Sequence, residues 1–325
     1  MFIFILRRVL YSIPVLLATS VVIFFSVTAL GDPLVTLRLN PQVSKVTIHN
    51  IEKRKHLNDS MVVQYGYWLR DAVTNGFGSP LLQPGTKIRD DLKRVMPHTL
   101  QLIILAELFA ISIGIGIGVY SAIRQYSIFD YLATTLSFLG FAMPLFWLAL
   151  MLQILFTNIF IRWHVRIFYT SGLNSDNPGT GIHFWIDRFQ HLAIPAMTLA
   201  ILSIAQYSRF VRAAMLEVVN SDYIRTARAK GLRERRIILR HALRNALIPL
   251  VTIVSLNVGA LLGGAVITET IFQLDGMGPY FLNNLFNQDA YAVMAWLMIT
   301  ATIVIFFNLL ADIAYGWLDP RIRYD

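Results

Sequence analysis

Six apolar stretches, each long enough to cross a lipid bilayer, constrain what this chain can fold into. A membrane-spanning helix needs about 17 to 25 consecutive, mostly apolar residues. Five of the stretches contain no charged residue, and the second contains only Glu107. They cover residues 9–30, 99–123, 131–161, 192–208, 246–268 and 290–311. The sequence therefore predicts an all-α integral membrane protein with six transmembrane helices.

Two of these stretches allow a second interpretation. The first follows Arg7 and Arg8, as the apolar part of a signal peptide would, but its 22 uninterrupted residues are long for one and no convincing cleavage site follows. We expect an uncleaved first span. The third stretch is long enough either to tilt or to include a short non-spanning piece around Pro144.

The distribution of basic residues predicts the orientation of the spans. Six spans place both termini on one side, and short cytoplasmic segments carry the excess of Lys and Arg. If the termini are cytoplasmic, the inside segments hold fifteen basic residues and the short outside loops hold only Arg162, Arg166 and Arg188. The first outside segment, 31–98, has ten basic residues but is long enough to be largely exempt from the rule. We expect both termini and the segment around Ser221 in the cytoplasm.

This topology divides the chain into four parts. The long outside segment contains an apolar and aromatic piece, MVVQYGYWL at 61–69, so we expect it to fold as a small extracytoplasmic cap domain. The expected parts are an N-terminal tail with the first span (1–30), the cap (31–98), a membrane core (99–316) and a cytoplasmic C-terminal tail (317–325). The core holds spans two to six and a cytoplasmic loop at 213–245.

The long basic segment at 221–249 lies between two apolar stretches and carries eight Lys or Arg against two acidic residues. Ser221 and Asp222 are favourable residues at a helix start, and Gly231 is the kind of residue that ends a helix in the left-handed conformation. The spacing predicts a short helix between them, with Tyr223, Ile224 and Ala227 on one side. After Gly231, apolar residues alternate with arginines in a pattern that favours a second helix along the membrane surface.

Catalytic and cofactor-binding motifs are missing from the sequence. No Gly-Lys dipeptide occurs, so the chain has no phosphate-binding P-loop. Cysteine is absent, and the seven histidines are scattered without the spacing of a metal site. The glycines Gly114, Gly116 and Gly118 lie inside the second span, where close helix packing explains them better than nucleotide binding. We expect no catalytic residue, no bound metal and no cofactor on this chain.

Polar residues inside the apolar stretches are candidates for a translocation path, because they are costly in lipid and usually face a partner or a cavity. Glu107 is the clearest candidate, and a bond to a neighbouring helix is the structural alternative for it. The set of polar candidates is Glu107, Gln206, Asn257 and Asn308.

The basic segment also resembles a known family motif. RTARAKG at 225–231 is similar to the EAA loop of permease subunits in bacterial ATP-binding-cassette importers, with Ala227 and Gly231 at the alanine and glycine positions of that motif. The motif's Glu is Arg225 here and its first Ala is Thr226. Further matches to the dipeptide and oligopeptide permease branch extend along nearly the whole chain: RRVLYSIPVL at 7–16, GDP at 31–33, QYGYWL at 64–69, NGFGS at 75–79, HLAIPAMTLA at 191–200, RHALRNALIP at 240–249, ETIFQLDGMG at 269–278 and DPRIR at 319–323.

The resemblance implies one half of a type I importer in the bacterial inner membrane. The chain would pair with a second, similar permease, with two cytoplasmic ATPase subunits that hold ATP and Mg²⁺, and with an extracytoplasmic solute-binding protein that delivers peptide. The implied coupling helix would fit a groove on one ATPase and comprises Asp222, Tyr223, Ile224, Arg225, Thr226, Ala227, Arg228, Ala229, Lys230 and Gly231.

Several alternatives remain open at this stage. The same architecture could carry nickel complexes, glutathione or another small solute. The basic segment could contact membrane lipid through its arginines, whereas nothing in the chain resembles a nucleic-acid-binding module, so we expect no nucleic-acid partner. A membrane-embedded enzyme would need several catalytic groups at one depth, which Glu107 alone does not supply. A pure scaffold or lipid anchor would not require a helix that ends at a glycine.

Overall fold

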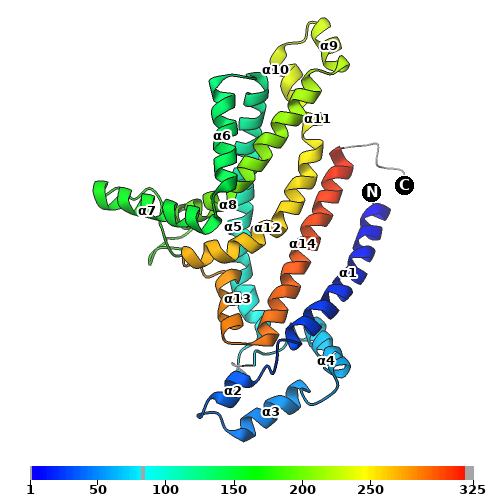
Figure 1. Ribbon diagram of the computed structural model, residues 1–325, viewed down its shortest axis with the longest axis vertical. Coiled ribbons are helices and arrows are strands. Elements are labelled where there is room, and N and C mark those ends of the chain that lie inside the picture. The colour runs from blue at the N-terminus through cyan, green and yellow to red at the C-terminus, as the bar shows by residue number, and fades with distance from the viewer. Residues whose placement is uncertain (1, 82–84, 319–325) are drawn as a thin grey trace. The chain divides into compact units, whose positions relative to one another are not determined.

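Every regular element in the described part of the chain is helical. The computed structural model describes residues 2–81 and 85–318 (Figure 1). The DPRIR sequence at 319–323 and most of the predicted C-terminal tail therefore lie outside the described residues. The elements are α1 (Phe2–Thr28), α2 (Val35–Leu39), α3 (Lys45–Lys55), α4 (Met61–Thr74), α5 (Ile88–Ile123), α6 (Ile128–Ala142), α7 (Leu145–Trp163), α8 (Ile182–Val219), α9 (Asp222–Ala229), α10 (Glu234–Arg236), a π-helix η1 (Ile237–Ala242), α11 (Leu243–Ala246), α12 (Ile248–Ile271), α13 (Met277–Phe286) and α14 (Ala290–Leu318).

Six of the described helices are long and apolar enough to cross a membrane, as predicted. The candidate spans are Ile5–Thr28, Ile88–Ile123, Leu145–Trp163, Ile182–Val219, Leu250–Ile271 and Ala290–Ala314. The third predicted stretch is broken near Pro144, which precedes α7 in an extended conformation, with φ −61° and ψ 136°. Proline has no backbone N–H and its ring disfavours a helical conformation in the residue before it. The local chemistry of Pro144 therefore explains the break. A shorter apolar helix, α6, precedes it.

The chain divides into two compact units. One comprises residues 1–99 and 275–309, and the other comprises residues 100–274 and 310–325. The predicted cap segment belongs wholly to the first unit, together with α1, α13 and much of α14.

The first unit has an aromatic core. Trp68 of α4 is 1% exposed and its ring lies 5.6 Å from that of Phe24 in α1 and 6.5 Å from that of Phe77. Tyr291 and Met294 of α14 join the same buried cluster. The apolar piece at 61–69 is therefore part of a helix whose buried face joins the cap to two long helices.

The second unit is built around α8. In Figure 1, α6 and α5 lie beside α8, and α9 lies beyond its end. The predicted close packing of glycines is confirmed for two of the three: a Cβ on Gly118 would lie 2.6 Å from the Ser208 carbonyl oxygen, and one on Gly114 would lie 2.9 Å from Tyr207 Cβ. Gly116 faces open space. Small residues four apart let the α5 and α8 backbones approach each other closely.

Candidate functional site

The short helix α9 ends where the sequence predicts. It covers Asp222–Ala229, and Gly231 follows in the left-handed conformation with φ +73°. The Leu232 N–H donates to the Ala227 carbonyl at 3.4 Å and the Gly231 N–H donates to the Arg228 carbonyl at 2.9 Å. These two bonds form a Schellman motif, which satisfies carbonyls that the end of the helix would otherwise leave unpaired.

The start of α9 has no capping hydrogen bond from the side chain of its N-cap residue. Ser221 occupies the N-cap position with φ −72° and ψ 155°, but its hydroxyl makes no capping bond and instead donates to the Val218 carbonyl at 2.6 Å. Ser221 therefore joins the end of α8 to the start of α9. The connection between the two helices consists of Asn220 and Ser221 alone.

One side of α9 is buried and the other is open. Ile224 is fully buried in an apolar cluster with Val211 and Met215 of α8, and Ala227 packs against the same cluster. Tyr223, expected on that side, is 45% exposed, although its hydroxyl accepts a bond from Asn245 Nδ2 at 2.9 Å. The exposed residues of the predicted coupling helix are Asp222, Tyr223, Arg225, Thr226, Arg228, Ala229, Lys230 and Gly231.

An ion pair closes the turn after α9. Arg228 Nη2 lies 2.8 Å from Glu234 Oε1 and Arg228 Nε lies 3.2 Å from Glu234 Oε2, so both carboxylate oxygens are used. The hydrogen bonds from Arg228 hold the pKa of the Glu234 carboxyl below its usual value. The attraction is present at neutral pH and is lost as the pH falls through that lowered pKa. Both side chains are exposed, so the contribution to stability is about 0.2 to 1 kcal/mol.

The chain returns from α9 to α12 through three short helical pieces, including the π-helix η1. Ile237 and Ala242 are buried in the same apolar cluster as Ile224, whereas Leu239 is 51% exposed. The arginines of this return, at 233, 235, 236, 240 and 244, are all exposed. The predicted separation into an apolar side and a basic side is confirmed in outline.

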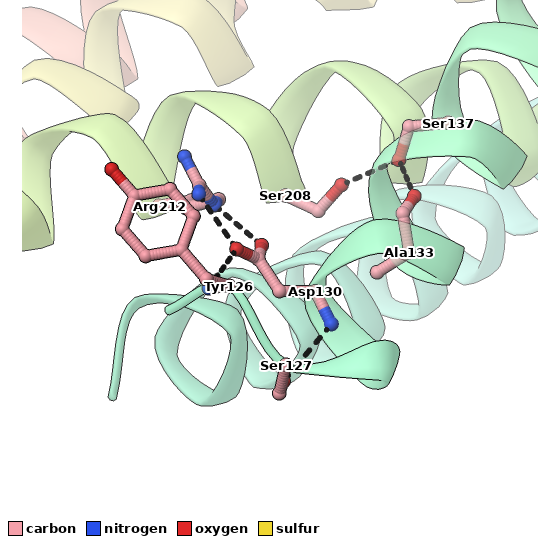
Figure 2. A network of polar contacts seen from close by, with 7 residues as sticks. All are labelled: Tyr126, Ser127, Asp130, Ala133, Ser137, Ser208 and Arg212. Carbon is pink, nitrogen blue, oxygen red and sulfur yellow. Dashed lines mark hydrogen bonds and ion pairs between the residues drawn. The ribbon is translucent and has the colours of Figure 1, made fainter. Parts of the chain in front are cut away.

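A largely buried ion pair joins α8 to α6 in the same unit as α9, and no sequence pattern predicted it (Figure 2). Arg212 Nε donates to Asp130 Oδ1 at 2.6 Å and Arg212 Nη2 donates to Asp130 Oδ2 at 2.7 Å. The Tyr126 N–H also donates to Asp130, and the Ser137 and Ser208 hydroxyls are 3.2 Å apart. The sequence signal was limited to an acidic residue, Asp130, just before the stretch 131–161 and two basic residues, Arg209 and Arg212, just after the stretch 192–208.

Two of the four predicted path residues come together in the second unit. Tyr207 of α8 donates its hydroxyl hydrogen to Glu107 Oε1 of α5 at 2.6 Å, and Asn257 Nδ2 of α12 lies 3.5 Å from Glu107 Oε2. Asn257 Nδ2 is also 2.9 Å from the Tyr207 hydroxyl and 2.7 Å from Ser203 Oγ. Three helices therefore share one polar cluster.

The other two candidates lie elsewhere. Gln206 is exposed on α8, next to the buried Tyr207, and Asn308 is half-buried on α14 in the first unit. Tyr207 and Ser203 were missed because a hydroxyl within an apolar stretch has no distinctive spacing. The described residues contain no group of three or more His, Cys, Asp or Glu that could hold a metal ion.

Comparison with known proteins places this arrangement in a family. Residues 114–324 match the family model described as "Binding-protein-dependent transport system inner membrane component". The chain is 40% identical to the oligopeptide transport system permease protein AppB of Bacillus subtilis, over 99% of each chain. It is 34% identical to the dipeptide transport system permease protein DppB of Escherichia coli K12, over 99% of this chain and 98% of the relative.

A third relative and a solved structure agree. The oligopeptide transport system permease protein OppB of Mycobacterium bovis is 35% identical over 98% of each chain. The fold is similar to that of a chain in inward-facing structures of the MetNI methionine ABC transporter, with a TM-score of 0.53 and 16% identity, over 71% of this chain and 98% of the other. The predicted fold class, a type I importer permease, is confirmed. This chain belongs to the family of binding-protein-dependent transport system inner membrane components.

Proposed function

We propose that this chain is one of two permease subunits of an ATP-binding-cassette importer for short peptides. The observation that carries the substrate class is the identity of 34 to 40% to permeases named for oligopeptide and dipeptide transport, extending over nearly the whole length of each chain. Those names favour peptides over the nickel complexes or glutathione considered from the sequence. The proposed partners are a second permease, two ATPase subunits and a solute-binding protein.

The exposed side of α9 is the proposed contact with an ATPase subunit. Its buried side packs on α8 through Ile224, and the Schellman motif and the Arg228–Glu234 pair define its end, so a force on the exposed side would reach α8. ATP would act by stabilising one arrangement of the ATPase pair, and α9 would transmit that preference to the spans. ATP and Mg²⁺ would bind the ATPase subunits and not this chain.

The proposed orientation places α9 and both termini in the cytoplasm and the segment at 31–98 outside. The excess of basic residues around α9 supports it. The cap would then receive solute from the binding protein. Its aromatic core, centred on Trp68, supports a folded docking surface and not a flexible linker.

The polar cluster of Glu107, Tyr207 and Asn257 is proposed to hold three spans together. Its bonds run between α5, α8 and α12, and polar side chains that satisfy one another leave little capacity for a passing solute. Gln206, which is exposed on α8, is the candidate that we retain for the translocation path in this unit, and Asn308 is retained in the other.

Cross-linking from a single introduced cysteine tests the coupling role, because the chain contains no natural cysteine. Ala229→Cys places a thiol on the exposed side of α9, and Ala227→Cys places one two residues away on the side that packs against the apolar cluster. In membranes that contain the assembled importer, a short cross-linker should capture an ATPase subunit from the Ala229→Cys variant far more efficiently than from the Ala227→Cys variant.

The result tests both the contact of α9 with an ATPase subunit and the orientation of the chain in the membrane. Capture from the Ala229→Cys variant alone, with its thiol protected from impermeant reagents outside the cell, supports the proposal. Equal capture from both variants would mean that α9 does not present a defined side. A thiol at position 229 that is labelled from outside the cell would reverse the proposed orientation.

A further inference from the structure

The first unit contains a cavity of about 710 Å³ that none of the functions above uses. Its wall includes the end of α1, residues of α2, α3 and α4, and the start of α14, all within that one unit. Small-molecule sites in proteins commonly measure about 300 to 1,000 Å³. The cavity is therefore large enough for a few amino-acid residues.

The wall is mostly apolar with one charged group of residues. Val27, Val35, Leu57 and Met61, which are half-buried or exposed, contribute apolar surface. Polar groups that converge on a mostly apolar wall are the usual composition of a ligand site, because the apolar part supplies affinity and the polar part supplies orientation.

The charged group has a defined structure. Arg38 Nε lies 2.9 Å from Asp32 Oδ2, and Arg38 Nη2 lies 2.7 Å from Glu52 Oε1. Asp32 Oδ1 accepts the Leu34 N–H at 2.9 Å. Among the described residues, Glu52 Oε2 has only the exposed His49 ring nearby, at 3.7 Å, and the Glu52 side chain is 15% exposed.

The sign of this charge selects the ligand. Among the described lining residues there are two carboxylates, Asp32 and Glu52, and one cation, Arg38, so the wall carries a formal charge of 1 − 2 = −1. The Arg38 guanidinium is already engaged by both carboxylates, which makes it a poor receptor for a further phosphate or carboxylate group. A lipid headgroup phosphate is therefore disfavoured, and an ammonium group is favoured because it can donate to Glu52 Oε2.

Lys55 does not reverse this balance. Its ammonium is not part of the wall: it donates to the Ser79 carbonyl at 2.8 Å and lies 4.2 Å from the centre of the Tyr291 ring.

We infer that this cavity binds the amino-terminal end of a short peptide, with the α-ammonium group at Glu52 and an apolar side chain among Val27, Leu57 and Met61. The inference rests on the proposed function for the identity of the solute. It adds a place on the permease, at the ends of two candidate spans, where peptide pauses after release from the binding protein.

The test measures binding to the whole chain in phosphatidylcholine nanodiscs at pH 7.5. The probes are trileucine and N-acetyl-trileucine, which differ in the ammonium charge, and saturation-transfer NMR gives the affinities. Trileucine should bind about fivefold more tightly than its acetylated form, the ratio expected for about 1 kcal/mol from one partly exposed ion pair.

Three variants locate the bound probe. Glu52→Gln removes the proposed ammonium acceptor and should weaken trileucine binding by about fivefold, with no change for the acetylated form. Met61→Trp fills the cavity from a residue that is 53% exposed, and should weaken both probes by at least about tenfold. Asp59→Asn is the matched control, because it removes a cap carboxylate that is not part of the wall and should change neither affinity.

Each contrary result overturns the inference. Equal affinity for the two probes, or a neutral amphiphile such as octyl glucoside binding as tightly as trileucine, would assign the cavity to lipid-like molecules. Unchanged binding in both Glu52→Gln and Met61→Trp, with gel filtration showing intact protein, would place the peptide elsewhere.

Peptide uptake by the assembled importer separates this inference from the proposed function. If the wild-type importer takes up trileucine but both variants bind it normally, the inference fails alone. If the nanodisc results are as expected but the wild-type importer transports no peptide, the proposed function fails alone.

Discussion

Replacing Gly231 tests whether the conformation of one residue maintains the coupling geometry. A Cβ at this position would meet no atom within 4 Å, so a substitution introduces no clash. The cost comes from the backbone, because φ is +73° and residues with a Cβ are strained there by about 1 to 2 kcal/mol. A penalty of that size shifts a local equilibrium about 5- to 30-fold.

Three substitutions separate conformation from size. Asparagine tolerates the left-handed region better than other non-glycine residues, alanine carries the ordinary penalty, and valine is β-branched and carries the largest. We expect ATP-dependent peptide uptake by the assembled importer to fall in the order wild type, Gly231→Asn, Gly231→Ala, Gly231→Val. The amount of chain in the membrane should be unchanged, because the apolar spans are not altered.

The assay is uptake of a labelled tripeptide into right-side-out vesicles loaded with ATP, normalised to the amount of permease, with vesicles that lack ATP as the control. Normal uptake by Gly231→Val would refute the coupling role of this turn. An Asn variant as defective as the Val variant would show that side-chain size, and not backbone conformation, is what the partner detects.

Three further substitutions test the packing, each in purified protein by thermal unfolding or limited proteolysis. Gly118→Ala should destabilise the protein by about 1 to 3 kcal/mol, because the new Cβ would overlap the α8 backbone. Gly116→Ala is the control and should be tolerated, because Gly116 faces open space. Equal effects of the two substitutions would argue against close contact between α5 and α8. Asp130→Ala should lower the free energy of unfolding by about 3 kcal/mol. This is the low end for a broken buried ion pair, because the Arg212 side chain is 27% exposed. A change below about 1 kcal/mol would mean that the pair is not formed. Trp68→Ala should lower the free energy of unfolding by about 3 to 5 kcal/mol, because the side chain is fully buried. Protease should then cleave the cap before the rest of the chain, and simultaneous cleavage everywhere would contradict a separately stabilised cap.

The spans and the end of α9 could be predicted from the sequence because both depend on local chemistry. An apolar stretch of sufficient length forms a helix in lipid whatever its neighbours are, since every backbone N–H and C=O must be paired within it. Gly231 ends α9 because glycine reaches the left-handed conformation at little cost. Pro144 breaks the third stretch for an equally local reason. The coupling role of α9 itself stays a prediction.

Side-chain positions on α9 show where local reasoning was insufficient. Spacing placed Tyr223 and Ile224 on one side of the helix, yet Ile224 is fully buried while Tyr223 is 45% exposed. The difference arises because the buried side of α9 is set by the surface of α8 that it meets, and not by the spacing of its own apolar residues.

The sequence alone determined that this chain is a multi-span helical protein with a basic segment that forms a short, glycine-terminated helix. Which distant groups meet depends on how the helices pack. The bonds between Asp130 and Arg212 join residues 82 positions apart, and the bond between Glu107 and Tyr207 joins residues 100 positions apart. Likewise, the cavity of the first unit takes its wall from both the N-terminal and the C-terminal parts of the chain. Helix periodicity shows which residues share one face of a helix. Which face of one helix contacts which neighbouring helix depends on tertiary packing, and local sequence patterns do not specify that packing.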